Sequence, residues 1–204
     1  MRKGNLYVIS GPAGTGKGTV VELLRNNHDD INVSVSMTTR KPRATDVDGV
    51  TYYFTTREDF ERRIEEGEFL EYNIFDGNNE YYGTPKFSAE KTLNEGKDIV
   101  LEIDVNGAKN VKRLMPNAVA IMIIPPDLET LESRIRGRAS EPNDEILQRL
   151  ETAKKEVKLL TEYDYVVINE QGKPEECAEM IYSIIQADRQ RIIYTKSYLD
   201  NFDI

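Results

Sequence analysis

The sequence predicts an α/β fold: a parallel sheet flanked by helices, with a small α+β insert and a mobile lid. Two observations support this prediction. Apolar stretches of strand length alternate with helical stretches, which is typical of parallel strands joined by right-handed crossovers. Some of these stretches, such as Val119-Ala-Ile-Met-Ile-Ile124, show no polar alternation, as expected of strands covered on both faces.

The predicted elements follow one another along almost the whole chain. Short apolar runs predict strands over residues 6–10, 33–37, 69–75, 98–103, 118–124 and 165–168. The longer stretches between and after them predict helices over residues 17–27, 58–66, 86–94, 107–114, 128–136, 144–160 and 174–187. Neither an internal repeat nor a low-complexity tract interrupts this order.

Two regions depart from the alternation. Residues 39–84 are polar and rich in tyrosine and charge, with only short strand signals, which indicates an insert standing off the sheet. Residues 134–149 are dense in arginine and contain Gly137 and Pro142, which favours a mobile flap over a core element, although arginine also forms helices well. We therefore expect a domain over residues 4–187, divided into a core (1–35, 87–126, 160–190), an insert (36–86), a lid (about 127–159) and, beyond it, a tail (191–204).

The composition excludes several classes of protein. Of the 204 residues 39% are hydrophobic and 31% charged, so the chain can bury a core. No stretch approaches the run of about 18 apolar residues that a membrane span needs, and no signal peptide is evident. The single cysteine, Cys177, cannot form an internal disulfide, and a cytoplasmic location is expected. A net charge of -9 argues against nucleic-acid binding. The single histidine, His28, is expected in a solvated loop.

A glycine-rich loop follows the first predicted strand and precedes the first predicted helix. Its pattern, Gly11-x-x-x-x-Gly16-Lys17, is that of a P-loop NTPase, in which backbone N–H groups and a lysine bind the phosphates of a nucleotide. The helix N-terminus adds partial positive charge. The residues expected to bind ATP are Gly11, Pro12, Ala13, Gly14, Thr15, Gly16, Lys17, Gly18 and Thr19.

A carboxylate for Mg²⁺ is predicted at the end of another strand. Gly18 occupies the position where the motif usually has the hydroxyl that binds Mg²⁺, which leaves Thr19 as the nearest hydroxyl. Asp104 ends the apolar strand that includes Ile99-Val-Leu, at the edge where parallel sheets bind ligands, and is expected to hold Mg²⁺ through water. Asp104 could equally cap the following helix, and the two roles are compatible.

The insert resembles the acceptor-binding region of guanylate kinases. The resemblance lies in Ser34-Val-Ser36-Met-Thr-Thr-Arg40-Lys-Pro-Arg43, Asp48-Gly49-Val-Thr-Tyr52, Gly67-Glu-Phe-Leu-Glu71, Tyr81-Tyr82-Gly83-Thr84 and Leu101-Glu102-Ile-Asp104. It covers residues 4–187 in the family's order and spacing. It implies Mg²⁺-dependent phosphoryl transfer from ATP to GMP, and to dGMP as well, by a monomer or homodimer that binds neither nucleic acid nor membrane.

The resemblance also implies roles for individual side chains. Arg40, Arg43, Tyr52 and Tyr82 are expected to hold the GMP phosphate, which suits planar guanidinium groups and neutral hydroxyls. Glu71 is expected to accept the two donors on the guanine edge, N1–H and the 2-amino group. The remaining expected GMP contacts are Ser36, Thr84, Glu102 and Asp104; Glu102 could instead face Mg²⁺ through water, and Thr84 could be a helix cap. The arginines could be surface residues and the tyrosines could pack the insert.

The chemistry expected of such a site is positioning and charge neutralisation rather than proton transfer. A phosphate monoester has a second pKa near 6, so the acceptor oxygen needs no general base. Lys17 and Arg40, with Arg134, Arg138 and Arg149 from the lid, are the expected catalytic cations. Asn169 is expected near the adenine. Two alternatives stay open, namely a kinase-like module that only binds peptides and a kinase for another acceptor such as AMP. An intact phosphate loop opposes the first, and Glu71 opposes adenine.

Overall fold

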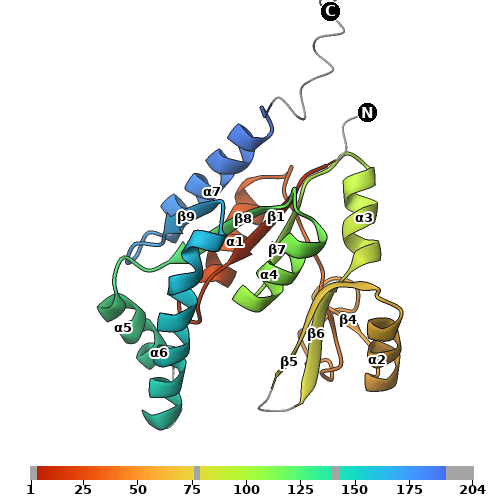
Figure 1. Ribbon diagram of the computed structural model, residues 1–204, viewed down its shortest axis with the longest axis horizontal. Coiled ribbons are helices and arrows are strands. Elements are labelled where there is room, and N and C mark those ends of the chain that lie inside the picture. Colours follow the sequence, from red (N-terminus) through yellow and green to blue (C-terminus); the bar gives the residue numbers. More distant parts are fainter. Residues whose placement is uncertain (1–3, 76–78, 139–142, 192–204) are drawn as a thin grey trace, which may run out of the picture.

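The computed structural model describes residues 4–75, 79–138 and 143–191. Its central layer is a sheet of five parallel strands, which confirms the predicted architecture. In spatial order the strands are β2 (Asn32–Val33), β7 (Ile99–Glu102), β1 (Leu6–Ser10), β8 (Val119–Ile124) and β9 (Tyr165–Ile168). Figure 1 shows this sheet as the body of the molecule, with two arms extending from it on the same side.

Both faces of the central sheet are covered by helices. The helices are α1 (Lys17–Asn27), α3 (Lys86–Asn94), α4 (Val105–Leu114) and α7 (Pro174–Asp188). Alternate residues of β1 point to opposite faces. Tyr7 and Ile9 belong to the buried cluster that includes residues of α1 and α7, whereas Leu6 and Val8 belong to the cluster that includes residues of α3 and α4. Burial on both sides explains why β1, β7 and β8 consist mostly of apolar residues.

The insert forms the first arm, around a smaller sheet. Its elements are β3 (Met37–Thr38), β4 (Tyr53–Phe54), α2 (Arg57–Glu65), β5 (Phe69–Phe75) and β6 (Glu80–Pro85), and the strand order is β4-β3-β6-β5. Met37, Phe60, Phe69 and Tyr81 form its own apolar core. The insert can therefore hold its shape largely through contacts of its own.

The structure differs from the prediction at the junction between core and insert. Residues 33–37 were expected as one strand, but Val33 ends β2 in the central sheet and Met37 begins β3 in the insert sheet. Ser34 still donates its N–H to Val100, whereas the carbonyl of Ser36 accepts from Tyr53. The chain thus changes sheets across three residues. No strand was predicted at β6, where the Tyr-Tyr-Gly-Thr segment carries the family resemblance.

The second arm is the lid, formed by α5 (Leu128–Arg138), α6 (Asn143–Val157) and the 3₁₀ helix η1 (Lys158–Glu162). In the described residues, the segment expected as a flap consists of the end of α5 and the start of α6. Leu131, Ile135, Ile146, Leu150 and Ala153 form a buried apolar cluster between α5 and α6. Residues 139–142, in the middle of the expected flap, lie outside the described ranges. The predicted α6 continued to residue 160, whereas its last turn tightens into η1 after Val157.

The remaining predicted elements begin and end within two residues of the observed ones. His28 is not simply solvated, because its ring stacks on Tyr182 at 3.5 Å and its Nε2 lies 3.0 Å from Glu179. Cys177 is buried in the core. Among the described residues, no helix combines the length and apolarity needed to cross a membrane.

Candidate active site

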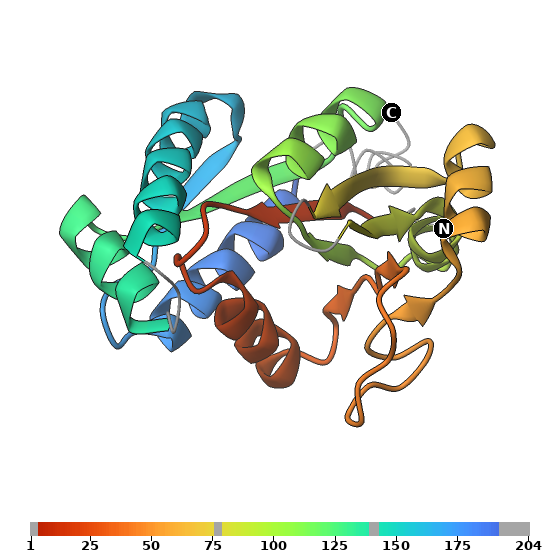
Figure 2. The same cartoon turned by 90° about the horizontal axis from the view of Figure 1, so that it is seen from below.

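The phosphate loop connects β1 to α1 at the edge of the central sheet. Figure 2 shows the loop, in red, between the lid and the insert. Gly16 precedes α1 with a φ of 87°, a left-handed conformation that favours glycine. A Cβ at Gly16 would also lie 2.6 Å from Nδ2 of Asn169. No side chain caps α1, so its first N–H groups remain available for an anion.

Lys17 is held over this loop by the loop's own backbone. Its ammonium donates to the carbonyl of Gly11 and, at 3.2 Å, to the carbonyl of Pro12. A full positive charge is thus positioned at the turn that the motif assigns to phosphate. Binding of a phosphate would exchange neutral carbonyl partners for an anion, which is electrostatically favourable.

A cavity of about 190 Å³ opens beside the loop. It brings together the predicted phosphate-binding lysine, one lid arginine and one strand-end carboxylate. The lining residues are Pro12, Ala13, Gly14, Thr15, Gly16, Lys17, Gly18, Glu102, Ile135 and Arg149. Thr19 is exposed on α1 and is not part of this lining.

Arg134 and Asn169 tie the lid and β9 to the loop. Arg134 donates to the carbonyl of Asn169 at 2.9 Å and to that of Thr15 at 3.5 Å. Nδ2 of Asn169 donates to the carbonyl of Thr15 at 2.8 Å, while its Oδ1 is buried without a hydrogen-bond partner. Arg134 thus lies against the loop, as a donor-side cation should. The side chain of Arg138, also predicted to be catalytic, lies outside the described residues.

Glu102 lies on the phosphate side of the site. One of its carboxylate oxygens, Oε1, is 3.5 Å from the point where a Cβ on Gly18 would lie. The carboxylate therefore borders the space left by the hydroxyl that most such loops carry at this position. Burial raises the pKa of Glu102, and the charge of Lys17 opposes this rise.

The predicted base-reading pair is assembled across β5 and β6. Glu71 is 8% exposed and Thr84 1%, and they are opposite each other in the antiparallel register. The Thr84 hydroxyl donates to Oε1 of Glu71 at 2.7 Å. Thr84 is not a helix cap here, because Pro85 is the N-cap of α3. Burial raises the pKa of Glu71 to about 7, although the Thr84 hydrogen bond lowers it and the charge of Asp104 raises it further.

A cationic and aromatic cluster lies elsewhere on the insert. The guanidinium of Arg40 is 5.3 Å from the ring centre of Tyr52, and the Tyr52 ring is 5.9 Å from that of Tyr82. Arg40 also forms an ion pair with Asp46 at 2.9 Å. The hydrogen bond from Arg40 lowers the pKa of Asp46, and Asp46 in turn raises that of Arg40. The structure thus brings the predicted phosphate contacts Arg40, Tyr52 and Tyr82 together.

Two further predicted residues lie close to this cluster. Arg43 is exposed, and its backbone N–H donates to Asp46 at 2.7 Å. The Ser36 side chain is partly buried, and its carbonyl accepts from the backbone of Tyr53. Asp46 therefore organises both arginines of the Arg-Lys-Pro-Arg segment.

Asp104 caps α4, as the sequence analysis allowed. Its Oδ1 accepts from the N–H of Gly107 at 2.7 Å, and its Oδ2 accepts from Nδ2 of Asn73 at 2.6 Å. Asp104 is therefore bonded to the insert, whereas Glu102 lines the cavity at the phosphate loop. The two carboxylates of this strand end have separate surroundings.

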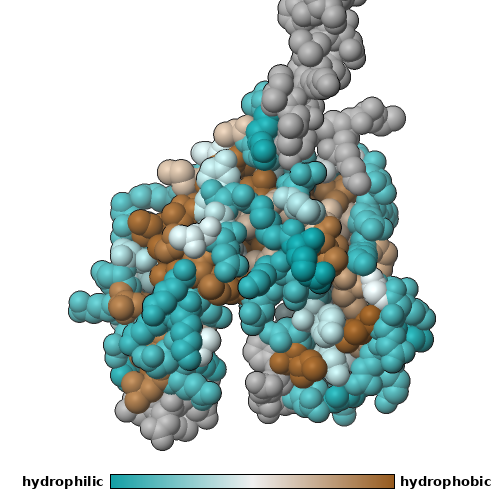
Figure 3. Space-filling model, viewed as in Figure 1, coloured by the Kyte–Doolittle hydropathy of each residue, from teal (hydrophilic) through white to brown (hydrophobic). Residues whose placement is uncertain are grey.

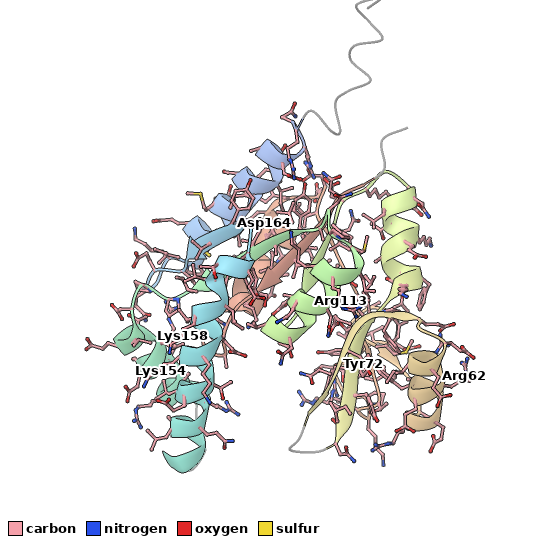
Figure 4. All side chains as sticks on the ribbon, viewed as in Figure 1. Arg62, Tyr72, Arg113, Lys154, Lys158 and Asp164 are labelled. Atoms are coloured by element: carbon pink, nitrogen blue, oxygen red, sulfur yellow. The ribbon has the colours of Figure 1, made fainter. Side chains whose placement is uncertain are left out.

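The space between the two groups of residues is open. The space-filling view shows a hollow between the two arms (Figure 3). In Figure 4, Tyr72 on β5 marks one arm and Lys154 on α6 marks the other. The described residues that line the phosphate-loop cavity come from the core and the lid. The Glu71–Thr84 pair and the cluster around Arg40 belong to the insert.

Three residues of this site were missed by sequence reasoning. Asp46 carried a weak signal, as an acid just after the paired arginines. Gly107 carried a clearer signal, as a glycine at the first position of a predicted helix. A Cβ at Gly107 would lie 2.9 Å from Oε2 of Glu71. Asn73 gave no signal, because its partner lies 31 positions away.

Comparison with known proteins places this geometry in a family. The family model described as guanylate kinase matches residues 3–188. A guanylate kinase from Shouchella clausii is 50% identical over 194 residues, covering 94% of this chain and 93% of the relative. One from Lactococcus lactis is 47% identical over 190 residues, covering 93% and 91%. The crystal structure of guanylate kinase from Anaplasma phagocytophilum superimposes with a TM-score of 0.73 at 31% identity, covering 95% of this chain and 90% of that one.

Proposed function

The chain belongs to the guanylate kinase family, and from this premise we propose how its residues transfer a phosphoryl group from ATP to GMP. The observation that carries the proposal is the buried pair of Glu71 and Thr84 on the arm opposite the phosphate loop. A guanine and a triphosphate could then meet in the hollow between the arms. The insert would bind the acceptor, and the loop with the lid would bind the donor.

Recognition of guanine follows from the chemistry of this pair. An ionised Glu71 can accept both N1–H and the 2-amino group, and the Thr84 hydroxyl can turn from Glu71 towards the guanine O6. Adenine would present a lone pair at N1 to the same carboxylate. Because an unpaired buried polar group costs about 1–3 kcal/mol, adenine should be disfavoured strongly. The Ser36 hydroxyl is a further candidate contact to the base.

The GMP phosphate is assigned to the cationic and aromatic cluster. Arg40 and Arg43 supply guanidinium donors, and Tyr52 and Tyr82 supply hydroxyl donors that add no charge. Asp46 fixes the Arg40 side chain in the absence of nucleotide. The acceptor oxygen is thereby held in place while its ionised phosphate remains nucleophilic without a general base.

On the donor side, the loop from Gly11 to Thr19 is assigned to the ATP phosphates. Lys17 would leave the carbonyls of Gly11 and Pro12 for the β- and γ-phosphates. Arg134 and Arg149 already border the loop or its cavity, and Arg138 is proposed to join them. These cations would neutralise the charge that spreads over the transferring group. Asn169 has a buried acceptor, Oδ1, that suits an amino group of the adenine.

The residues present fit a magnesium ion. Oxygen donors suit this hard cation, and Mg²⁺ usually retains several water ligands. Glu102 borders the space beside Gly18, so we assign it to the metal side of the site, with Thr19 as a further candidate. Asp104, also predicted to hold Mg²⁺ through water, is bonded to the insert beside Glu71, so we assign it to the acceptor side as a GMP contact. When bound, Mg²⁺ would supply charge neutralisation at the β- and γ-oxygens. Within the described ranges, no three acidic, histidine or cysteine side chains form a metal cluster of their own.

Several finer assignments belong to the same proposal. The core, insert and lid are taken to move relative to one another, so that water is excluded when both nucleotides are bound. We propose that the enzyme works in the cytoplasm, where its substrates are found, and that it accepts dGMP as well as GMP. The oligomeric state, which we propose to be a monomer or a homodimer, can be measured by analytical ultracentrifugation.

A coupled assay for ADP formation tests the proposal. With ATP and Mg²⁺, GMP should support turnover, dGMP should do so less well or equally, and AMP, UMP and CMP should not. Absence of ADP formation with GMP would instead favour the binding-only module. Rapid turnover with AMP would overturn the assignment of Glu71.

A further inference from the structure

Asn73 lies on the insert face that carries the proposed base contacts. It is two residues from Glu71 on β5, so the two side chains point to the same side of the strand. Its cross-strand neighbour is Tyr82, and the neighbour of Glu71 is Thr84. Asn73 thus lies among residues already assigned to GMP, although neither the sequence nor the proposed function gives it a role.

Two hydrogen bonds fix the orientation of the Asn73 amide. The backbone N–H of Ile74 donates to Oδ1 at 2.8 Å. This contact requires an acceptor, so the donor end of the amide must point the other way. That donor, Nδ2, reaches Oδ2 of Asp104 at 2.6 Å. The amide therefore acts as an oriented donor to the carboxylate rather than as a polar group of arbitrary direction.

The hydrogen bond joins two parts of the molecule. Asn73 belongs to the insert, whereas Asp104 lies in the core, between β7 and α4, and is the N-cap of α4. With Oδ1 on Gly107 and Oδ2 on Asn73, the carboxylate is restrained from both sides. Each oxygen retains a lone pair for a further donor. Because the Asn73 amide is neutral, it adds no positive charge beside Asp104.

Resting on the proposed function, we propose that Asn73 is a positioning residue for the acceptor nucleotide. It holds the Asp104 carboxylate at the joint between β5 and α4, beside Glu71, so that the carboxylate is already in place when GMP enters. Its contribution should therefore be to GMP binding rather than to the donor site, because its contacts are on the acceptor side of the hollow.

Single substitutions separate this role from simple packing. Asn73→Ala removes the donor, and Asn73→Leu removes it while keeping a similar volume. Both should raise the KM for GMP about tenfold, the effect expected for losing a hydrogen bond to a charged group, with the KM for ATP and kcat changed less than about twofold. Asn73→Asp keeps the shape but places two carboxylates in contact, and should raise the KM for GMP further, by about thirtyfold.

A double variant that exchanges the two side chains tests whether the carboxylate must be at position 104. Asn73→Asp combined with Asp104→Asn restores an amide–carboxylate hydrogen bond with its partners exchanged, and asparagine is also a good helix cap. The thermal midpoint should return towards that of the wild type, while the KM for GMP should stay high. If the double variant restores the KM as well, Asn73 merely ties β5 to α4 and the positioning role is wrong.

Asn32→Ala is the matched control, because Asn32 also donates through its amide, at 2.9 Å, to the carbonyl of Asp98. It should leave both KM values unchanged. Unchanged KM for GMP in the folded Ala and Leu variants, or an equal rise for ATP, would overturn the inference. Failure of the wild-type enzyme to phosphorylate GMP would overturn the proposed function instead, so the two failures are distinguishable.

Discussion

The phosphate loop and the insert are built to bind their expected ligands by different means. The phosphate loop is built from backbone, and its cations are held by carbonyls, Lys17 by Gly11 and Pro12 and Arg134 by Thr15 and Asn169. The insert site is built from side-chain pairs, such as Glu71 with Thr84 and Arg40 with Asp46. We expect the loop to bind triphosphates in general and the insert to select the acceptor, because guanine would replace the present hydrogen-bond partners of its side chains.

The largest expected effect comes from removing the cation of the loop. Lys17→Ala should lower kcat by at least about 10³-fold, because the variant loses a charge that neutralises the transferring phosphoryl group. The KM for GMP should change by less than about threefold, since GMP is assigned to the other arm. Steady-state kinetics with Lys173→Ala, an exposed lysine paired with Glu176, provide the control. Substantial turnover by Lys17→Ala would contradict the assigned phosphate site.

Glu71→Gln should have the next largest effect, and it should be confined to the acceptor. An amide cannot accept both guanine donors, so kcat/KM for GMP should fall by about 10²-fold, with the KM for ATP unchanged. The free protein should become more stable at pH 8, by about 2 kcal/mol, because the buried charge is removed. Kinetics and thermal unfolding of the same preparation test both parts. Equal losses for both substrates would place Glu71 outside guanine recognition.

Gly107→Ala should show a smaller effect of the same kind. The new methyl group would lie 2.9 Å from Oε2 of Glu71 and 3.3 Å from Oδ1 of Asp104. One of these carboxylates must move, so we expect the KM for GMP to rise about tenfold. Stability should change little, because alanine is a better helix former than glycine by about 1 kcal/mol. Gly137→Ala on the lid, where a Cβ would meet no neighbour within 4 Å, is the matched control.

The smallest predicted effect is a pH dependence of the insert alone. The pKa of Glu71 is raised to about 7, and guanine needs the ionised form. The affinity for GMP should therefore fall about fivefold from pH 7 to pH 6 through the loss of ionised Glu71, beyond the protonation of the GMP phosphate itself. Titration calorimetry should show proton release on GMP binding, and dGMP should behave alike. Glu71→Gln should keep only the phosphate component.

The same raised pKa affects stability in a definite direction. The folded state holds a proton on Glu71 at pH values where the unfolded chain has lost it. This contribution to stability is fully present below the unfolded pKa of about 4.5 and is lost as the pH rises through about 7. The free protein thus loses stability over the pH range in which Glu71 ionises.

The phosphate loop and the central sheet were easier to predict from the sequence than the insert. The loop was predictable residue by residue, since its geometry requires glycine at positions such as Gly16. The central strands were predictable because burial on both faces leaves uninterrupted apolar runs. The start of α4 was placed two residues late, at Gly107, although Asp104 was recognised as a possible cap of the helix.

The side-chain pairs of the insert were not predictable in this way. Glu71, Thr84 and Arg40 were found through the family resemblance, but Asp46, the partner of Arg40, was not. Asp46 and Asn73 acquire a role only through contacts that form when the chain folds. Strand periodicity predicts the face on which a residue lies but not its partner. The split of residues 33–37 between two sheets has the same origin, because a run of polar and apolar residues does not state which sheet each residue joins.

The lid's private apolar cluster has a thermodynamic consequence. Leu131, Ile135, Ile146, Leu150 and Ala153 bury one another and share no member with the two clusters of the central sheet. A region with its own small core can open and close its amides as a cooperative unit, at a free energy below that of global unfolding. Ile135 also lies beside the loop at Gly14, so we expect a ligand that fills the loop cavity to stabilise this unit. Hydrogen exchange of the lid amides should then slow when the donor nucleotide binds.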